Sequence, residues 1–151
     1  DPAFHRPLPL TPEEAAAYRA DVATFGNFYP YRARLLEPLL DGSLQVKLYG
    51  SRPPRWLRHP ARDYWAHKHL SGDEKSKAML AARIALNTNH YAGIGDVNKR
   101  TFELAGIGAF QLTDARAALS KYFEPGVEIA VFQGRRRGTA CTRWPGGRGR
   151  P

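Results

Sequence analysis

Four basic residues stand where helices disfavour positive charge. Arg32 and Arg34 lie near the start of one expected helix, and Lys99 and Arg100 near the start of another. A helix N-terminus carries partial positive charge, so an exposed basic side chain in a first turn is unfavourable by about 0.3–1 kcal/mol. An anion held between the two helix starts would turn both penalties into one site, because helix N–H groups and arginine forks suit phosphate oxygens. The placement therefore indicates a diphosphate site.

Each of these cations also has an ordinary explanation. Any one of them could pair with Glu37, with Asp96 or with solvent. Both helices are expected to start at the carboxyl edge of the same parallel sheet, where ligands bind in such folds. This convergence on one edge is what favours a shared ligand.

One carboxylate lies just beyond the second pair of cations. Glu103 follows Lys99 by four residues, which places both on one face of the helix. A carboxylate can accept hydrogen bonds from two neighbouring hydroxyls, which is how ribose is recognised. The alternative is an ordinary ion pair between Lys99 and Glu103 within the helix. The residues alone leave both interpretations open.

The elements that must position these residues alternate between strand and helix. Alternating or short apolar runs predict strands at 21–26, 44–50, 83–87, 109–113 and 127–132. Capping signals and apolar spacings of three and four predict helices at 11–19, 30–40, 71–82, 97–105 and 115–122. The stretch 52–70 reads as irregular. This order predicts an α/β fold with a parallel sheet covered by helices.

Length and composition exclude several classes of protein. With 151 residues, 42% of them hydrophobic and 25% charged, the chain is expected to form one folded domain rather than a disordered polymer. It contains neither an apolar run of about 20 residues for a transmembrane segment nor a secretory signal. The single cysteine, Cys141, fits a reducing compartment, so we expect a cytoplasmic protein. Met79 is the only methionine, which suggests a piece of a longer protein.

The net charge of +9 is unevenly distributed. Residues 133–151 contain six arginines, five glycines and no acid, so that 17 basic residues face 14 acidic ones in the rest of the chain. This composition predicts a disordered basic tail. The tail is either an RNA-binding segment or a non-native end.

A second basic stretch, 52–68, combines arginines with tryptophans and histidines. Trp56 and Trp65 among four arginines resemble a footprint for single-stranded nucleic acid. His59, His67 and His69 have no spacing typical of zinc sites. A loop that faces a missing domain explains the stretch equally well.

Three strings in the second half resemble a known family. They are 98–106 (NKRTFELAG), 108–114 (GAFQLTD) and 123–129 (FEPGVEI). Together with upstream segments such as 25–27 and 48–50, they resemble the nucleotide-binding half of CgeB-type spore-protein glycosyltransferases over about 22–132. That family belongs to the two-domain GT-B group. The resemblance implies the C-terminal, donor-binding half of a GT-B enzyme, with a Rossmann-like parallel sheet and helices on both faces.

The resemblance also implies roles for individual residues. Glu103 would contact the ribose, Arg100 and Arg32 the diphosphate, and Gly26 and Asn27 would form a close loop that leaves room for the donor. Asn98 and Lys99 complete the expected donor-binding set. No catalytic residue is assigned, since a base would come from the missing N-terminal acceptor domain, and neither a metal nor another cofactor is expected.

The sequence thus predicts a lead-in at 1–20, a donor-binding domain at 21–132 and the basic tail at 133–151. The predicted function is transfer of a sugar from a nucleotide-diphosphate sugar to an unknown acceptor, by an enzyme of which this chain is a part. The alternative is a basic nucleic-acid-binding module on an α/β scaffold, using 52–68 and the tail. Nucleic acid is the less favoured partner, because most of the excess charge lies outside the fold.

Overall fold

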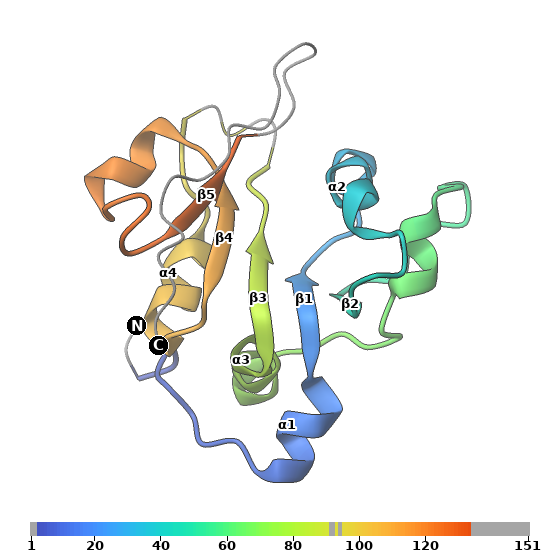
Figure 1. The fold of residues 1–151 in the computed structure, drawn as a ribbon, viewed down its shortest axis with the longest axis horizontal. Helices are drawn as coiled ribbons and strands as arrows, with labels where there is room; N and C mark the ends of the chain where they lie inside the picture. The colour runs from blue at the N-terminus through green and yellow to red at the C-terminus, as the bar shows by residue number, and fades with distance from the viewer. Residues whose placement is uncertain (1–2, 91–92, 94, 134–151) are drawn as a thin grey trace.

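A five-stranded parallel sheet forms the centre of the molecule (Figure 1). The structure is a computed structural model that describes residues 3–90, 93 and 95–133. The strands are β1 (Ala20–Phe25), β2 (Val46–Tyr49), β3 (Ala82–Asn87), β4 (Gln111–Asp114) and β5 (Ala130–Phe132), in the order β2-β1-β3-β4-β5. All four strand pairs are parallel. The predicted Rossmann-like α/β fold is confirmed.

Short helices connect the strands. They are α1 (Pro12–Tyr18), α2 (Pro30–Leu36), α3 (Gly72–Ala81) and α4 (Lys99–Ile107), with 3-10 helices η1 (Glu37–Leu39), η2 (Pro60–Tyr64) and η3 (Ala117–Lys121). The helix expected at 115–122 is only the 3-10 turn η3, because Ala115 still donates a backbone hydrogen bond to Phe132 of the neighbouring strand. The helix expected at 30–40 tightens into η1 at Glu37, next to Pro38. Among the described residues no helix has the length and apolarity needed to cross a membrane.

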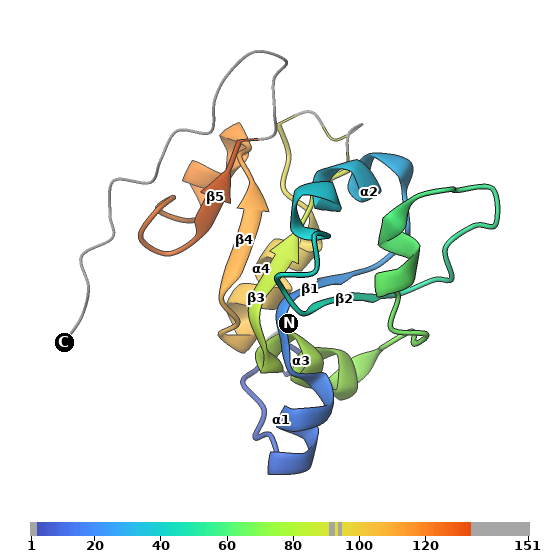
Figure 2. The same ribbon diagram turned by 45° about the vertical axis from the view of Figure 1, so that its right-hand side comes forward.

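Helices cover both faces of the sheet (Figure 2). Alternate strand residues belong to opposite cores. On one face Ala23 and Ala85 pack with Met79 of α3 and with Leu104 and Ile107 of α4. The other core holds residues of β1, β2 and β3, of α2 and of the segment that includes η2: Val22, Leu48, Leu86, Ala33, Leu36, Leu57 and Ala61. Burial on both faces explains why Ile84, Ala85 and Leu86 of β3 form an uninterrupted apolar run.

The segment expected as a lead-in packs against the domain through α1. Thr11 caps α1 and forms a capping box with Glu14. The carboxylate of Glu14 lies 2.6 Å from Lys77 Nζ of α3, and the Tyr18 hydroxyl donates to Glu74 of the same helix at 2.6 Å. Residues 11–18 therefore extend the helical layer beside α3.

Candidate functional site

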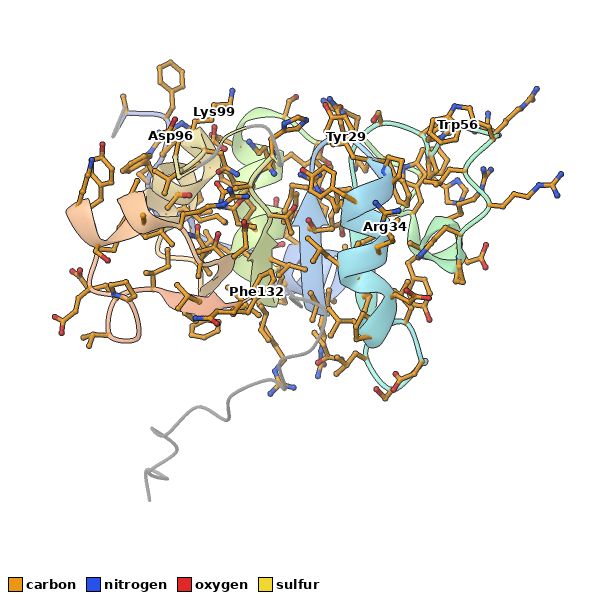
Figure 3. All side chains as sticks on the ribbon, turned by 90° about the horizontal axis from the view of Figure 1, so that it is seen from above. Tyr29, Arg34, Trp56, Asp96, Lys99 and Phe132 are labelled. Atoms are coloured by element: carbon orange, nitrogen blue, oxygen red, sulfur yellow. The ribbon has the colours of Figure 1, made fainter. Side chains whose placement is uncertain are left out.

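The carboxyl ends of β1 and β3 lie next to each other in the sheet. The connection after β1 runs to α2 on one face, and the connection after β3 runs to α4 on the other. Open α/β sheets bind ligands at such a point, where the connections diverge. Figure 3 looks onto this edge, with Tyr29 beside the start of α2 and Lys99 at the start of α4.

Arg32 of α2 and Arg100 of α4 meet over Gly26, the residue that follows β1. Gly26 has a φ of +112°, and a Cβ built on it would lie 2.9 Å from Nη2 of Arg100 and 3.4 Å from Nη1 of Arg32. The two guanidinium groups therefore occupy the space that any side chain at position 26 would fill. A glycine here allows both guanidinium groups to approach the backbone at the end of β1.

Arg32 is held rigidly by neutral groups. Its side chain is buried, Nε donates to Oγ1 of Thr88 at 2.8 Å, and Nη1 donates to the carbonyl oxygens of Asn27 at 2.7 Å and Phe25 at 3.3 Å. Among the described residues no carboxylate lies within ion-pair distance of this guanidinium. Burial lowers the pKa of Arg32, because desolvation disfavours the charged form.

Arg100 is a second cation that forms no ion pair with any carboxylate of the described residues. Its Nε is buried and has no hydrogen-bond partner among the described residues. Burial and the neighbouring charge of Arg32 lower the pKa of Arg100 to about 10, which still leaves a cation at pH 7. Two adjacent desolvated cations repel each other unless an anion lies between them. The arrangement is therefore suited to bind a doubly charged group such as a diphosphate.

The loops after β1 and β2 support this site by packing backbone against backbone. Gly26 N donates to Tyr49 O at 2.9 Å. Gly50 has a φ of +141°, and a Cβ on it would lie 2.1 Å from Gly26 O. The Asn27 amide accepts from the Ser51 hydroxyl at 3.3 Å and donates to the Tyr29 hydroxyl at 3.2 Å. Gly50 thus supports the loop that contains Gly26, a role that was not expected from the sequence.

Asn98 caps α4 and ties it to β3. Its Oδ1 accepts from Thr101 N at 3.2 Å, and its Nδ2 donates to Asn87 Oδ1 at 2.9 Å and to Thr88 O at 3.3 Å. Asn87 Nδ2 in turn donates to Asn98 Oδ1 at 3.2 Å. The amide of Asn98 bonds to protein groups and positions α4 against β3, while the expected contact with the donor stays a prediction.

Replacing Asn98 by alanine is expected to lower the free energy of unfolding by about 1–3 kcal/mol. The change removes an N-cap and leaves Oδ1 of the buried Asn87 without the hydrogen bond from Asn98. Urea unfolding monitored by circular dichroism measures the loss. The matched control is Ser71→Ala, since Ser71 is the N-cap of α3 but makes no side-chain capping bond. Equal, small losses in both variants would contradict the capping role.

The remaining basic residues of the expected site do not join the arginine pair. Lys99 is the first residue of α4, and its side chain is exposed. Arg34 is also exposed and lies in the last turn of α2, because that helix has only seven residues. The structure therefore places Arg34 at the helix end that favours positive charge, which corrects the expectation of a first-turn position.

Glu103 pairs across helices instead of within α4. Its Oε2 lies 2.7 Å from Nζ of Lys75 on α3, so the expected alternative of a Lys99–Glu103 pair is wrong. Burial alone would raise the pKa of Glu103, but the hydrogen bond and charge of Lys75, with smaller contributions from His5 and Arg100, hold that pKa below its usual value. Glu103 is therefore an ionised acceptor at neutral pH, three residues after Arg100 on the same helix.

Glu103 also lines a pocket of about 230 Å³. The pocket lies against α3, α4 and the lead-in, and its lining residues are Phe4, His5, Gly72, Asp73, Lys75, Ser76, Met79, Glu103 and Ile107. Arg100 and Glu103 influence each other electrostatically. Helix α4 thus contributes Glu103 to the pocket and Arg100 to the arginine pair.

Polar residues at the carboxyl ends of β3 and β4 form further contacts at this edge of the sheet. Their roles were not expected from the sequence. Thr88 orients Arg32, while Asn89 donates to Asp114 Oδ1 from its backbone at 2.7 Å and from its side chain at 3.0 Å. Asp114 also pairs with Arg116 at 2.8 Å. The available signal was the run of polar residues, Asn87 to Asn89, at the carboxyl end of an expected strand.

The stretch 52–68 is organised mainly by its own side chains. Arg62 donates to the carbonyl oxygens of Pro54 at 2.6 Å and Leu57 at 3.1 Å, and His59 Nδ1 accepts from Ala61 N at the start of η2. Trp56 remains 69% exposed. Within residues 3–90, 93 and 95–133, no three acidic, histidine or cysteine side chains are arranged to hold a metal ion. The tail expected at 133–151 lies outside the described residues from position 134 onwards.

A family model described as glycosyl transferase-like matches residues 32–141. The chain belongs to this glycosyl transferase-like family. The match begins at Arg32 and includes Arg100 and Glu103, and membership in a glycosyltransferase family implies a nucleotide-sugar donor. No curated protein and no solved structure matches the chain.

Proposed function

We propose that this chain is the donor-binding half of a GT-B glycosyltransferase of the CgeB type, which holds a nucleotide-diphosphate sugar while the sugar passes to an acceptor. The observation that carries this proposal is the convergence of Arg32 and Arg100 over Gly26, with no ion pair to a carboxylate in the part of the chain that the structure describes. The family match adds the reaction class.

The arginine pair supports a specific chemical role. When the bond between the sugar and the diphosphate breaks, negative charge grows on the leaving phosphate oxygens. Cations fixed before the reaction stabilise this charge without a reorganisation cost. Arg32 is fixed by Thr88 and by the Asn27 carbonyl, and the N–H groups at the start of α4 add a second favourable electrostatic contribution. In this proposal the leaving group is stabilised by the protein itself, without a metal.

The proposal assigns the nucleoside to the pocket beside Glu103. A ribose in that pocket would place its hydroxyls next to an ionised carboxylate, and the attached diphosphate would extend along α4 toward Arg100. The acceptor and any catalytic base are assigned to a separate acceptor-binding domain.

Replacing Glu103 by glutamine is expected to weaken nucleoside diphosphates by about 10-fold or more and to change pyrophosphate affinity less than twofold. A neutral amide accepts weaker hydrogen bonds from ribose hydroxyls than a carboxylate does. A hydrogen bond to a charged group contributes about 1.5–3 kcal/mol, and one between neutral groups about 0.5–1.5 kcal/mol. Titration calorimetry with UDP, GDP, ADP, CDP, dTDP and pyrophosphate measures the change.

The control for this experiment is Glu14→Gln. Glu14 is also paired with a lysine of α3, but it lies on α1 outside the pocket lining. The control should bind every ligand as the wild type does. An equal loss of nucleotide and pyrophosphate affinity in Glu103→Gln would contradict the ribose role.

A further inference from the structure

We propose that Lys75 is a positioning residue for Glu103, which fixes one carboxylate oxygen and thereby presents the other to the two hydroxyls of a ribose. This inference rests on the proposed nucleotide-binding function. It predicts that the site distinguishes ribonucleotides from 2′-deoxyribonucleotides, and that Lys75 controls this preference without contacting the ligand.

The geometry separates the two oxygens of Glu103. Lys75 Nζ lies 2.7 Å from Oε2, and the two side chains are only 24% and 10% exposed. Among the described residues no hydrogen bond to Oε1 is formed. Because Lys75 comes from α3 and Glu103 from α4, the carboxylate is held from across the pocket, and its plane is fixed with respect to the cavity.

The charges around Glu103 make Lys75 the dominant partner. The groups that act on the carboxylate are Lys75 from α3, His5 from the lead-in and Arg100 from α4, and Asp73 lines the same pocket. Burial raises the pKa of Glu103, and Lys75 is the largest influence in the opposite direction. Without Lys75, this carboxyl would take up a proton at a higher pH and lose its capacity to accept two strong hydrogen bonds.

A protonated or reoriented carboxyl affects a ribose more than a deoxyribose. A ribose offers two neighbouring hydroxyl donors, and a site built to accept both rejects a ligand that lacks one. The diphosphate is held separately by Arg32 and Arg100. Loss of Lys75 should therefore reduce ribose recognition while the phosphate contacts persist.

Lys77 provides a matched control on the same helix. It forms an ion pair of similar geometry with Glu14, at 2.6 Å and with side chains 26% and 31% exposed. Neither residue lines the pocket. Lys77→Met therefore reports what the loss of one comparable ion pair of α3 does to the domain.

The test compares Lys75→Met, Lys75→Arg and Lys77→Met in titration calorimetry. The ligands are pyrophosphate, the tightest binder among ADP, GDP, UDP and CDP, and the 2′-deoxy form of that nucleotide. For Lys75→Met we expect an approximately tenfold loss of ribonucleotide affinity at pH 7, pyrophosphate affinity within about twofold, and a reduced preference for ribose. Lys75→Arg should restore most of the preference, and Lys77→Met should bind as the wild type does.

The pH dependence gives an independent readout. Between pH 8 and pH 5.5 the ratio of ribose to deoxyribose affinity should stay constant in the wild type, because the lowered pKa keeps Glu103 ionised. In Lys75→Met the same ratio should fall as the pH is lowered. Using the ratio cancels the titration of the phosphate groups, which both nucleotides share.

Three results would overturn the inference. One is an unchanged ribose preference and pH profile in Lys75→Met, even with a lower melting temperature. Another is an equal loss of pyrophosphate affinity, which would make Lys75 a phosphate contact. The third is a wild type that binds pyrophosphate but binds the ribonucleotide and its 2′-deoxy form equally well. This result would reject the role of Lys75 without contradicting diphosphate binding by Arg32 and Arg100. If Lys75→Met does not fold, Lys75→Gln is tested in its place with the same expected results. A folded wild type that binds no diphosphate would contradict the proposed function itself.

Discussion

Replacing Arg100 by methionine is expected to weaken diphosphate binding by about 10- to 150-fold and to leave the ligand-free domain at least as stable as the wild type. A hydrogen bond to a charged group contributes about 1.5–3 kcal/mol, which corresponds to this range of affinities. Without a ligand, Arg100 is desolvated and repelled by Arg32, and its buried Nε has no hydrogen-bond partner among residues 3–90, 93 and 95–133. Removing it therefore relieves an unfavourable charge in the free domain and removes a favourable contact from the complex.

Calorimetric titration with pyrophosphate and thermal melts of the same variant test both halves of this prediction. Arg34→Met is the matched control, because Arg34 carries the same charge but is exposed in the last turn of α2. The control should bind pyrophosphate as the wild type does. A lower melting temperature with unchanged affinity in Arg100→Met would show that Arg100 stabilises the fold and does not bind phosphate.

Replacing Gly50 by alanine is expected to lower the free energy of unfolding by about 2–6 kcal/mol. Its φ of +141° is a conformation that residues with a side chain rarely adopt, at a cost of about 1–3 kcal/mol. The added methyl would also lie 2.1 Å from Gly26 O, so the loops after β1 and β2 would have to separate. Such overpacking costs about a further 1–3 kcal/mol.

Urea unfolding of Gly50→Ala and of Gly42→Ala separates the strain from the clash. Gly42 also has a positive φ, +86°, but a Cβ on it would meet no atom within 4 Å. Gly42→Ala should therefore lose only about 1–2 kcal/mol, the cost of the backbone conformation. Similar losses in the two variants would contradict the close packing of the two loops.

The elements could be predicted because their signals are local. The short apolar run in 83–87 and the helical spacing and cap at 97–105 specify a strand and a helix wherever the chain folds. The order of these elements then restricts the fold to a parallel sheet. The placement of Arg32 and Arg100 at one edge follows from the same order, since parallel strands end together.

The contacts that define the site are not local, and the sequence analysis missed them. Lys75 and Glu103 are 28 residues apart, and no spacing rule connects them. Gly26 and Gly50 meet only because β1 and β2 are neighbours in the sheet. Asn98 shows the same limit, because an N-cap and a ligand contact have the same sequence signal, and the difference lies in the partner, Asn87.

We propose that the carboxyl edge of the sheet at β1 and β3 binds the diphosphate of a nucleotide, and we test this site by the affinity of the wild-type chain for matched ligands. Calorimetry at low salt measures the affinity of each nucleoside diphosphate and of its nucleoside. In a second titration pyrophosphate is present as a competitor. We predict that at least one nucleoside diphosphate binds, that its nucleoside binds about 100-fold more weakly or not at all, and that pyrophosphate displaces the nucleotide. Equal affinities for nucleotide and nucleoside, or no binding by a folded wild-type chain, would contradict diphosphate binding at this edge of the sheet.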